Sequence, residues 1–341
     1  MNTIIRSRAP IRVDFSGGWT DVPPFSEREG GAVINATINR YTYATLISRA
    51  DDKIRIISAD FEKYIEVADY RSLEYDGNLD LIKAAVRVLN VQTGMDIYVR
   101  CDAPPGSGTG SSSSISVALI GLLNNLQPVK FSPHEVAKLA RKLEVHELFI
   151  AGGKQDYYAS ALGGVNFLEF DDPAVSSSKL QLSPAVLRDM EKQMILCYTG
   201  QSRLSGDIIK IVMGAYERNE KKTCDALRNL KRIAYDMKNA LLSGNLHDFA
   251  RLMGENWENQ KALDSSVTNP RIDRLFEVAT AAGALGGKAC GAGGGGCILF
   301  YCNENTEHLV RKALIAEGAQ IIEFNFEHEG LQSWISPISA S

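Results

Sequence analysis

The stretch APPGSGTGSSSSISVALIGLLNNL at residues 103–126 decides how the rest of the sequence is interpreted. Glycines stand at alternate positions (Gly106, Gly108 and Gly110), and four consecutive serines then open an apolar segment. That segment predicts a helix over 111–126, with the glycines forming a loop at its N-terminus. Unshielded backbone N–H groups at the positive end of a helix stabilise phosphate oxygens. The stretch therefore predicts a phosphate-binding loop, and the alternative is a serine-rich helix cap.

A second glycine-rich stretch, GGKACGAGGGGCILFY, lies at residues 286–301. Its spacing Gly291-x-Gly293-x-x-Gly296 formally matches the fingerprint of dinucleotide-binding folds. That fingerprint requires a helix after the glycines, whereas here the strand-like CILFY follows, so we reject a nicotinamide-dinucleotide site. A run with so few side chains allows close backbone approach, either to a ligand or to the first glycine loop. The alternative is a tight turn between packed elements.

Segments with the patterns of strands and of helices are mixed along the chain. The expected strands are 41–48, 53–58, 95–101, 162–170, 193–200, 296–301 and 319–324, and the expected helices are 79–90, 111–126, 133–150, 227–241 and 305–317. Runs of strands and helices without regular βαβ alternation indicate an α+β protein rather than a Rossmann fold.

A chain of 341 residues has room for about two domains. The most linker-like stretch is DDPAVSSSKLQLSP at 171–184, because proline, serine and charged residues gather there. We therefore predict two domains, 1–175 and 185–335.

Composition excludes several classes of function. The net charge of −4 argues against a general nucleic-acid binder, which would usually be basic. No apolar run approaches the ~18 residues of a membrane span, and the N-terminus lacks the apolar core of a signal peptide, so we expect a cytoplasmic protein. The six cysteines form no CxxC pair and no zinc-type cluster, which favours small buried thiols in a reducing compartment.

Three segments resemble, in order and in spacing, the three motifs of the GHMP kinase superfamily, which includes galactokinase, homoserine kinase and mevalonate kinase. They are RAPIRVDFSGGWTDVPPF (8–25), PPGSGTGSSSS (104–114) and KACGAGGGGCILFY (288–301). GGWTDVPPF, GGAVINATINRYTYA and GGKQDYYASALGG look most like the bacterial D-glycero-D-manno-heptose 7-phosphate kinases. GGWTDVPPF is also similar to the kinase domain of fucokinases.

The sequence departs from the superfamily pattern at three places. Gly-Gly-Trp-Thr-Asp stands where galactokinases carry Gly-Glu-His-Thr-Asp, which counts against galactose as substrate. Thr109 and Ser113 occupy positions that are commonly leucine and alanine. Both changes are small and leave phosphate binding intact.

The resemblance implies a two-domain α+β kinase with an N-terminal domain like domain 2 of ribosomal protein S5 and a ferredoxin-like C-terminal domain. It implies an ATP- and Mg²⁺-dependent sugar kinase acting on the anomeric (C1) hydroxyl of D-glycero-D-manno-heptose 7-phosphate, for nucleotide-activated heptose synthesis. The alternatives are a fucokinase-like or other hexose 1-kinase, and a non-catalytic sensor of sugar and ATP. The expected partners are ATP and a sugar, which we expect to be a sugar phosphate, with no nucleic acid and no membrane. The expected state is a monomer or a homodimer.

Residue roles follow from the resemblance at the matching positions. ATP would be held by Pro105, Gly106, Ser107, Gly108, Thr109, Gly110, Ser111, Ser112 and Ser113. Asp156 would act as the catalytic base or orient the acceptor hydroxyl, and Arg12 would lie beside the transferring phosphate or the base. From the residues alone, Asp156 follows a glycine turn at the start of an expected helix, which also suits an ordinary helix-start acid.

Magnesium would be held by Ser112 and Glu144, both oxygen donors of the kind that Mg²⁺ prefers. A solvated helix charge is the alternative for Glu144, and Glu147 competes with it. The acceptor sugar would contact Trp19, Thr20, Asp21, Gly293 and Gly294, and Lys154 and Arg40 could meet a phosphate already present on the substrate.

The first expected strand has a basic polar face. Arg6, Arg8, Arg12 and Asp14 share one parity, so we expect them on one side of this strand. A solvent-facing strand surface is the alternative for Arg6 and Arg8.

Overall fold

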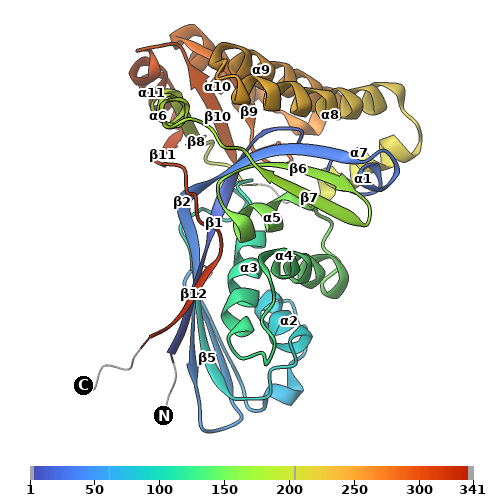
Figure 1. The fold of residues 1–341 in the computed structure, drawn as a ribbon, viewed down its shortest axis with the longest axis vertical. Coiled ribbons are helices and arrows are strands. Elements are labelled where there is room, and N and C mark those ends of the chain that lie inside the picture. The colour runs from blue at the N-terminus through green and yellow to red at the C-terminus, as the bar shows by residue number, and fades with distance from the viewer. Residues whose placement is uncertain (1–3, 61, 203–204, 337–341) are drawn as a thin grey trace.

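Two β-sheets, each covered by helices, form the computed structural model, which describes residues 4–60, 62–202 and 205–336 (Figure 1). The first sheet has the order β12-β1-β2-β5-β3-β4, and β6 and β7 extend it from β2. Its strands are β1 (Ile4–Ser16), β2 (Gly31–Ser48), β3 (Ile54–Ser58), β4 (Lys63–Val67), β5 (Met95–Cys101), β6 (Val165–Asp171), β7 (Ala174–Lys179) and β12 (Gln332–Ser336). Neighbouring strands are antiparallel except for β3 and β5.

The long strand β2 organises the first sheet, because each half pairs with a different neighbour. Residues 42–48 pair with β5, and residues 31–36 pair with β6. Helices α2 (Asp80–Val88), α3 (Ser111–Asn124), α4 (Pro133–Lys142) and α5 (Gln155–Leu162) cover one face of this sheet (Figure 1). Helix α3 is apolar on nearly all sides and is buried, as expected for a helix enclosed between a sheet and other helices.

The second sheet is antiparallel, with the order β11-β8-β10-β9. Its strands are β8 (Met194–Tyr198), β9 (Ala284–Ala289), β10 (Cys297–Cys302) and β11 (Gln320–Ile322). Numbered along the chain this order is 4-1-3-2, which confirms the predicted ferredoxin-like C-terminal fold. Its helices are α6 (Pro184–Gln193), α7 (Ser205–Glu217), α8 (Lys221–Leu242), α9 (Leu246–Leu263), α10 (Pro270–Ala282) and α11 (Glu307–Ala316).

One hydrophobic cluster joins the two sheets. Val13, Phe15 and Phe167 of the first sheet pack in the same cluster as Phe249 of α9 and Leu299 of β10, and all five are buried. The ring of Phe15 meets the ring of Phe249 edge-on, with 5.3 Å between centroids. The two halves of the chain therefore share a core where they meet.

The stretch predicted to be a linker contains a strand. Residues 174–179 form β7, which pairs with β6, so the linker-like stretch 171–184 is a strand over part of its length. Exposed and half-buried residues alternate over 174–178, as in a strand with one solvated face. The last strand, β12, returns to the first sheet and pairs with β1. The division into 1–175 and 185–335 stays a prediction. The strands β7 and β12 of the first sheet extend beyond residue 175.

A β-bulge in β1 overturns the prediction that four charged residues share a face. The pairing with β2 shifts between Pro10 and Ile11. Before the shift Ile5 and Ala9 pack in the cluster with α2–α4, and after it Val13 and Phe15 pack in the cluster with α8 and α9, so the two faces of the strand exchange. Arg6 and Arg8 consequently bond to Ser336 and Gln332 of the edge strand β12.

The helix predicted over 133–150 ends earlier than expected. Helix α4 stops at Lys142, and one π-helical turn, η2 (Leu143–Glu147), follows it. Phe149, one residue before the predicted end at 150, has a positive φ of 55° and is 85% exposed. The chain thus leaves the helix with an aromatic side chain in solvent.

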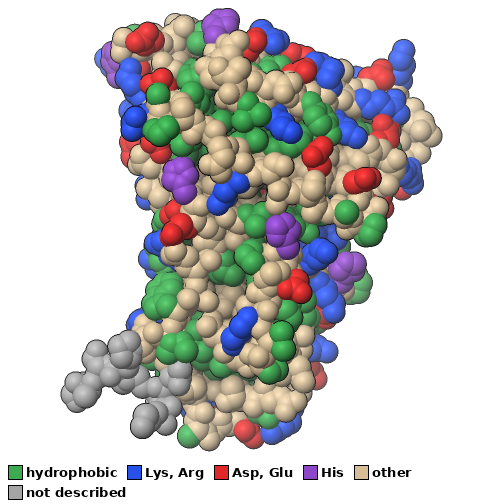
Figure 2. Space-filling model, viewed as in Figure 1, with side chains coloured by type: hydrophobic (Ala, Val, Ile, Leu, Met, Phe, Trp, Pro, Cys, Tyr) green, Lys and Arg blue, Asp and Glu red, His purple; other side chains and the backbone are tan. Residues whose placement is uncertain are grey.

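The surface shows interspersed charges on the face drawn in Figure 2, where Lys and Arg side chains alternate with Asp and Glu. Among the described residues, no helix is both long enough and apolar enough to cross a membrane. Of the six cysteines, five are buried and Cys101 is half-buried, and all are free thiols.

The C-terminal segment before β12 crosses the helices that face the first sheet. Leu331 packs on Gly121 of α3, and its N–H donates to the carbonyl of Ala161 in α5 at 3.3 Å. At the end of α5, Gly163 has a φ of 68°, and a Cβ built there would lie 2.2 Å from the backbone of Glu329. The segment therefore fixes the C-terminal end of α5.

We predict that Gly163→Ala lowers the free energy of unfolding by about 3 kcal/mol, because backbone strain and a backbone clash add together. The matched control is Gly77→Ala, since Gly77 also has a positive φ of 83° but nothing lies within 4 Å of its Cβ position. The control should lose only about 1 kcal/mol. Urea denaturation of the two variants measures this difference, and equal losses would contradict the close approach.

Candidate active site

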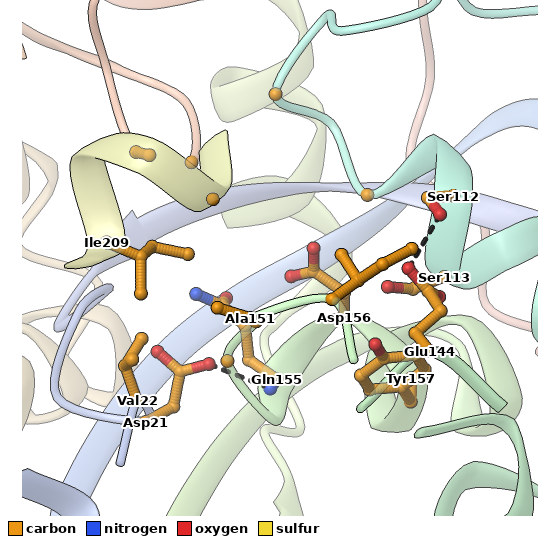
Figure 3. A pocket seen from close by; sticks show the side chains of 18 of the residues that line it. Asp21, Val22, Ser112, Ser113, Glu144, Ala151, Gln155, Asp156, Tyr157 and Ile209 are labelled. Carbon is orange, nitrogen blue, oxygen red and sulfur yellow. Dashed lines mark hydrogen bonds between the residues drawn. The ribbon is translucent and has the colours of Figure 1, made fainter. Parts of the chain in front are cut away.

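A cavity of about 560 Å³ opens between the first glycine loop, α5 and α7. Its volume lies in the range typical of small-molecule sites, about 300–1,000 Å³. Figure 3 shows Asp156 in its middle, with the serines of α3 on one side and Asp21, Val22 and Ile209 on the other. The cavity thus brings together residues from the two predicted domains.

The first glycine loop presents bare backbone to the cavity. Gly106, Gly108 and Gly110 line it, and their φ angles of 69°, 74° and 74° favour glycine. Between them, Ser107 and Thr109 are buried and share a hydrogen bond of 2.7 Å between their hydroxyls. The loop therefore turns its glycines outward and its two polar side chains inward.

The serines that follow the loop do not cap the helix. The N-cap of α3 is Gly110, and it makes no side-chain capping bond. Ser111, Ser112 and Ser113 line the cavity in the first turn. The helix N-terminus is consequently left open toward the cavity, which favours the phosphate-binding interpretation over the cap. Pro105, also predicted to contact ATP, is exposed at the start of the loop and is not among the cavity-lining residues of the described chain.

Arg12 holds Asp156 in place. Its Nε and Nη2 lie 2.8 and 2.7 Å from Oδ1 of Asp156, and its Nη1 donates to the carbonyl of Gly108 at 2.5 Å. The Arg12 side chain is only 3% exposed, whereas that of Asp156 is 25% exposed and reaches the cavity. Burial by itself would lower the pKa of Arg12, but Asp156 and Asp14 outweigh it and raise the pKa. The guanidinium therefore stays charged.

Beneath this pair lies a second ion pair that the sequence did not reveal. Nζ of Lys288 lies 2.5 Å from Oδ2 of Asp14, and both side chains are fully buried. Burial opposes ionisation of Asp14, but the charges of Lys288 and Arg12 hold its pKa below the usual value. A single lysine and a single aspartate far apart in the chain give no local signal that they meet.

Glu144 lies on the π-helical turn η2 and faces α3. Its two carboxylate oxygens accept hydrogen bonds from the hydroxyls of Ser112 (2.6 Å) and Ser116 (2.8 Å). Its burial raises its pKa, while these two hydroxyl bonds act in the opposite direction. Tyr157, which lines the same side, also has a raised pKa, through burial and the charge of Glu144. The competitor Glu147 instead accepts from the hydroxyl of Tyr75.

Asp21 lines the cavity and also anchors α5. Its Oδ2 accepts hydrogen bonds from the backbone N–H groups of Lys154 (2.8 Å) and Gln155 (2.9 Å). Burial raises the pKa of Asp21 against the effect of these two bonds. Because α5 begins here, Asp21 also sets the position of Asp156 in the first turn.

The predicted sugar-binding neighbours of Asp21 separate in the structure. Trp19 lines the cavity with a positive φ of 82°, and its buried Nε1 has no hydrogen-bond partner among the described residues. Thr20 is fully buried, and its hydroxyl donates to the carbonyl of Gly17 at 2.7 Å. The hydroxyl of Thr20 therefore stabilises the turn after Gly17 and is not directed at a ligand.

The two cations predicted to meet a substrate phosphate do not line the cavity of the described chain. Nζ of Lys154 lies 2.9 Å from Asp172, and its side chain is 7% exposed. Arg40 lies at the end of the first half of β2 and is not among the residues around the cavity.

The second glycine stretch connects β9 to β10 and packs against the first loop. A Cβ on Gly291 would lie 2.9 Å from the carbonyl oxygen of Gly108, and one on Gly296 would lie 2.6 Å from that of Ser107. Gly291 and Ala292 line the cavity. The predicted contacts Gly293 and Gly294 instead face Val267, whose carbonyl accepts from the N–H of Gly294 at 2.7 Å.

Several lining residues were missed by the sequence analysis. They come from residues 149–153, from α5 (Gln155, Tyr157) and from the start of α7 (Gly206, Asp207, Ile209, Lys210). The glycine turn before Lys154 was used only to place Asp156, and α7 gave no signal beyond an ordinary helix. Lys210 is exposed, and it lines the cavity because α7 lies at its edge.

The side chains that line the cavity carry an excess of negative charge. Arg12 and Lys210 are positive, whereas Asp21, Glu144, Asp156 and Asp207 are negative. Arg12 already neutralises Asp156. An anionic ligand such as a nucleotide would therefore rely on backbone N–H groups and a bound cation.

Comparisons with known proteins agree with this geometry. The model of the GHMP kinase N-terminal domain matches residues 80–164, and that of the C-terminal domain matches 237–320. A D-glycero-alpha-D-manno-heptose 7-phosphate kinase of Campylobacter jejuni is 32% identical over 97% of this chain and 98% of its own length. The L-fucokinase/L-fucose-1-P guanylyltransferase of Bacteroides fragilis is 26% identical over 96% of this chain but only 38% of its own length.

Among solved structures, a D-glycero-D-manno-heptose 1-phosphate kinase from Bacteroides thetaiotaomicron superposes with a TM-score of 0.82. It is 32% identical, and the match covers 98% of this chain and 100% of the other. Similarity of this extent, together with both domain models, shows that the chain belongs to the GHMP kinase family and is an ATP-dependent sugar kinase.

Proposed function

We propose that the protein transfers the γ-phosphoryl group of ATP to the anomeric hydroxyl of D-glycero-D-manno-heptose 7-phosphate. The observation that carries the proposal is Asp156, a cavity-facing carboxylate held by the buried Arg12 beside the bare glycine loop. Phosphoryl transfer depends on positioning and charge neutralisation, and this arrangement supplies both.

The polyphosphate of ATP would lie against the glycine loop. Backbone N–H groups of 106–113 would donate to its oxygens at the N-terminus of α3. A Cβ on Gly110 would come within 3.2 Å of the Asp156 carboxylate, so the loop and the carboxylate lie close together. The γ-phosphoryl group and the acceptor hydroxyl can therefore meet at Asp156.

Asp156 would accept or orient the proton of the attacking hydroxyl. It is the carboxylate at the centre of the cavity, and its Oδ1 is fixed by Arg12. Arg12 also contacts the carbonyl of Gly108, so one guanidinium sets the carboxylate and the phosphate loop relative to each other. Positive charge so near the transferring group also offsets the charge that develops on it.

The residues around Ser112 and Glu144 fit a magnesium ion. Both side chains offer oxygen donors and both line the cavity next to the glycine loop. When bound there, Mg²⁺ would neutralise charge on the phosphates of ATP. Ser112 and Glu144 are the residues that would hold it.

Lys210 is our candidate for the phosphate carried by the sugar. It replaces Lys154, whose ammonium is bound to Asp172. Lys210 lines the cavity on α7, which also supplies Ile209 opposite the phosphate loop in Figure 3. An exposed ammonium at the sugar end of the cavity suits a phosphate dianion.

The test of the substrate is a panel of sugars assayed for ADP release. The relatives differ in their names, which specify a heptose 7-phosphate, a heptose 1-phosphate and L-fucose. We expect the highest kcat/KM with heptose 7-phosphate and a product phosphorylated at C1. Turnover of free fucose without turnover of the heptose phosphate would replace the proposal with a fucokinase-like activity, and no turnover of any sugar would favour a sensor.

We predict that Asp156→Asn lowers kcat at least ~100-fold, because it removes the carboxylate that accepts or orients the proton of the acceptor hydroxyl. The amide keeps the shape of the side chain, so the dissociation constant for ATP should change little. Steady-state assays and calorimetric titration with ATP measure the two effects. A near-normal kcat would remove Asp156 from the mechanism.

We predict that Lys210→Met raises KM for the sugar phosphate about tenfold or more, because a charged hydrogen bond to phosphate is lost. KM for ATP should stay unchanged. The matched control is Lys222→Met, an exposed lysine on α8 outside the cavity. An equal KM in Lys210→Met and wild type would place the sugar phosphate elsewhere.

A further inference from the structure

The ion pair of Lys288 and Asp14 lies inside the protein, directly behind the cavity. Neither side chain has any exposed surface, and the ammonium nitrogen is 2.5 Å from Oδ2 of Asp14. Removing two charges from water is costly, and a well-packed apolar pair is often as stable or more stable. Stability alone therefore does not explain why charges occupy this place.

The contacts of the pair connect the second glycine stretch to β1. Nζ of Lys288 also donates to the carbonyl of Ala289 at 3.0 Å. The other carboxylate oxygen of Asp14, Oδ1, accepts from the N–H of Gly291 at 3.3 Å. Gly291 lines the cavity and touches Gly108, so the pair supports one wall of the site.

Asp14 is also a neighbour of Arg12. The two residues are two positions apart on β1, beyond the bulge at Pro10, and therefore lie on the same face of the strand. Asp14 and Asp156 both attract the guanidinium of Arg12. Four charges thus follow one another with alternating sign, from Lys288 through Asp14 and Arg12 to Asp156.

We propose that Lys288 is a positioning residue of the transfer reaction, whose ammonium engages Asp14 so that Arg12 stays bound to Asp156 and Gly108. The inference rests on the proposed roles of Asp156 and Arg12. Without Lys288, the buried carboxylate of Asp14 would lose its ion-pair partner. Arg12 would then be the nearest cation that could replace it. Arg12 would turn toward Asp14, and Asp156 would lose the partner that fixes its position.

The central experiment compares Lys288→Met with the double variant Asp14→Asn/Lys288→Met. The single variant should lower kcat about 10- to 100-fold with little change in KM for ATP, the size typical of a misplaced catalytic group. The double variant removes the competing carboxylate as well, so Arg12 returns to Asp156 and kcat should recover to within a few-fold of wild type. Both are assayed well below their melting temperatures.

A matched control separates positioning from stability. Lys83 is another buried lysine, 2% exposed and paired with Asp76 and Asp80, and it does not line the cavity. Lys83→Met should lower the melting temperature and leave kcat unchanged. If Lys288→Met behaves like this control, Lys288 is only structural and the inference is overturned.

Lys288→Gln keeps the test decisive if the methionine variant does not fold. Glutamine can still donate a hydrogen bond to Asp14 but carries no charge, so kcat should fall in this variant too. A wild-type kcat in Lys288→Gln, or a double variant as slow as Lys288→Met, would overturn the inference.

Asp156→Asn and Arg12→Met, assayed in parallel, distinguish the proposed catalytic roles of these two residues from the positioning role of Lys288. If neither lowers kcat, the proposed catalytic roles fail. If both lower kcat while the Lys288 variants do not, only the positioning role of Lys288 fails.

Discussion

The two glycine loops and β1 are joined through their main chains, and the active site depends on that contact. The N–H of Arg12 donates to the carbonyl of Thr109 at 3.0 Å, and the N–H of Cys297 donates to that of Ser107 at 2.7 Å. Because a Cβ at Gly108 would lie 2.6 Å from the carbonyl oxygen of Cys290, only glycine permits this approach. Segments nearly 200 residues apart in sequence thereby present one continuous wall to the substrate.

Charge within this wall is balanced by ion pairs rather than by solvent. Arg12 and Lys288 are enclosed, so each must have a carboxylate partner at short range. Asp156 is the most exposed of these charged side chains, with a quarter of its side chain exposed to the cavity. The arrangement leaves Asp156 both accessible and fixed, as the role that we propose for it requires.

The sequence predicted the local features of the site better than their assembly. The alternating glycines, the helix at 111–124 and the carboxylate at the start of α5 follow from short-range patterns. The bulge at Pro10 reversed the expected face of Arg8, because a register shift is set by pairing with β2 and leaves no periodic signal. Contacts such as Lys154 with Asp172 depend on tertiary structure, as does the cavity wall formed by α7.

The pairing of β12 with β1 affects the order in which parts of the chain can fold. The ribosome synthesises β1 long before β12, so β1 remains an open sheet edge until residues 332–336 have been made. The C-terminal end of α5 likewise waits for the residues around Glu329 and Leu331. Nascent chains that stop short of this segment would carry every motif of the site but leave that edge available to aggregate.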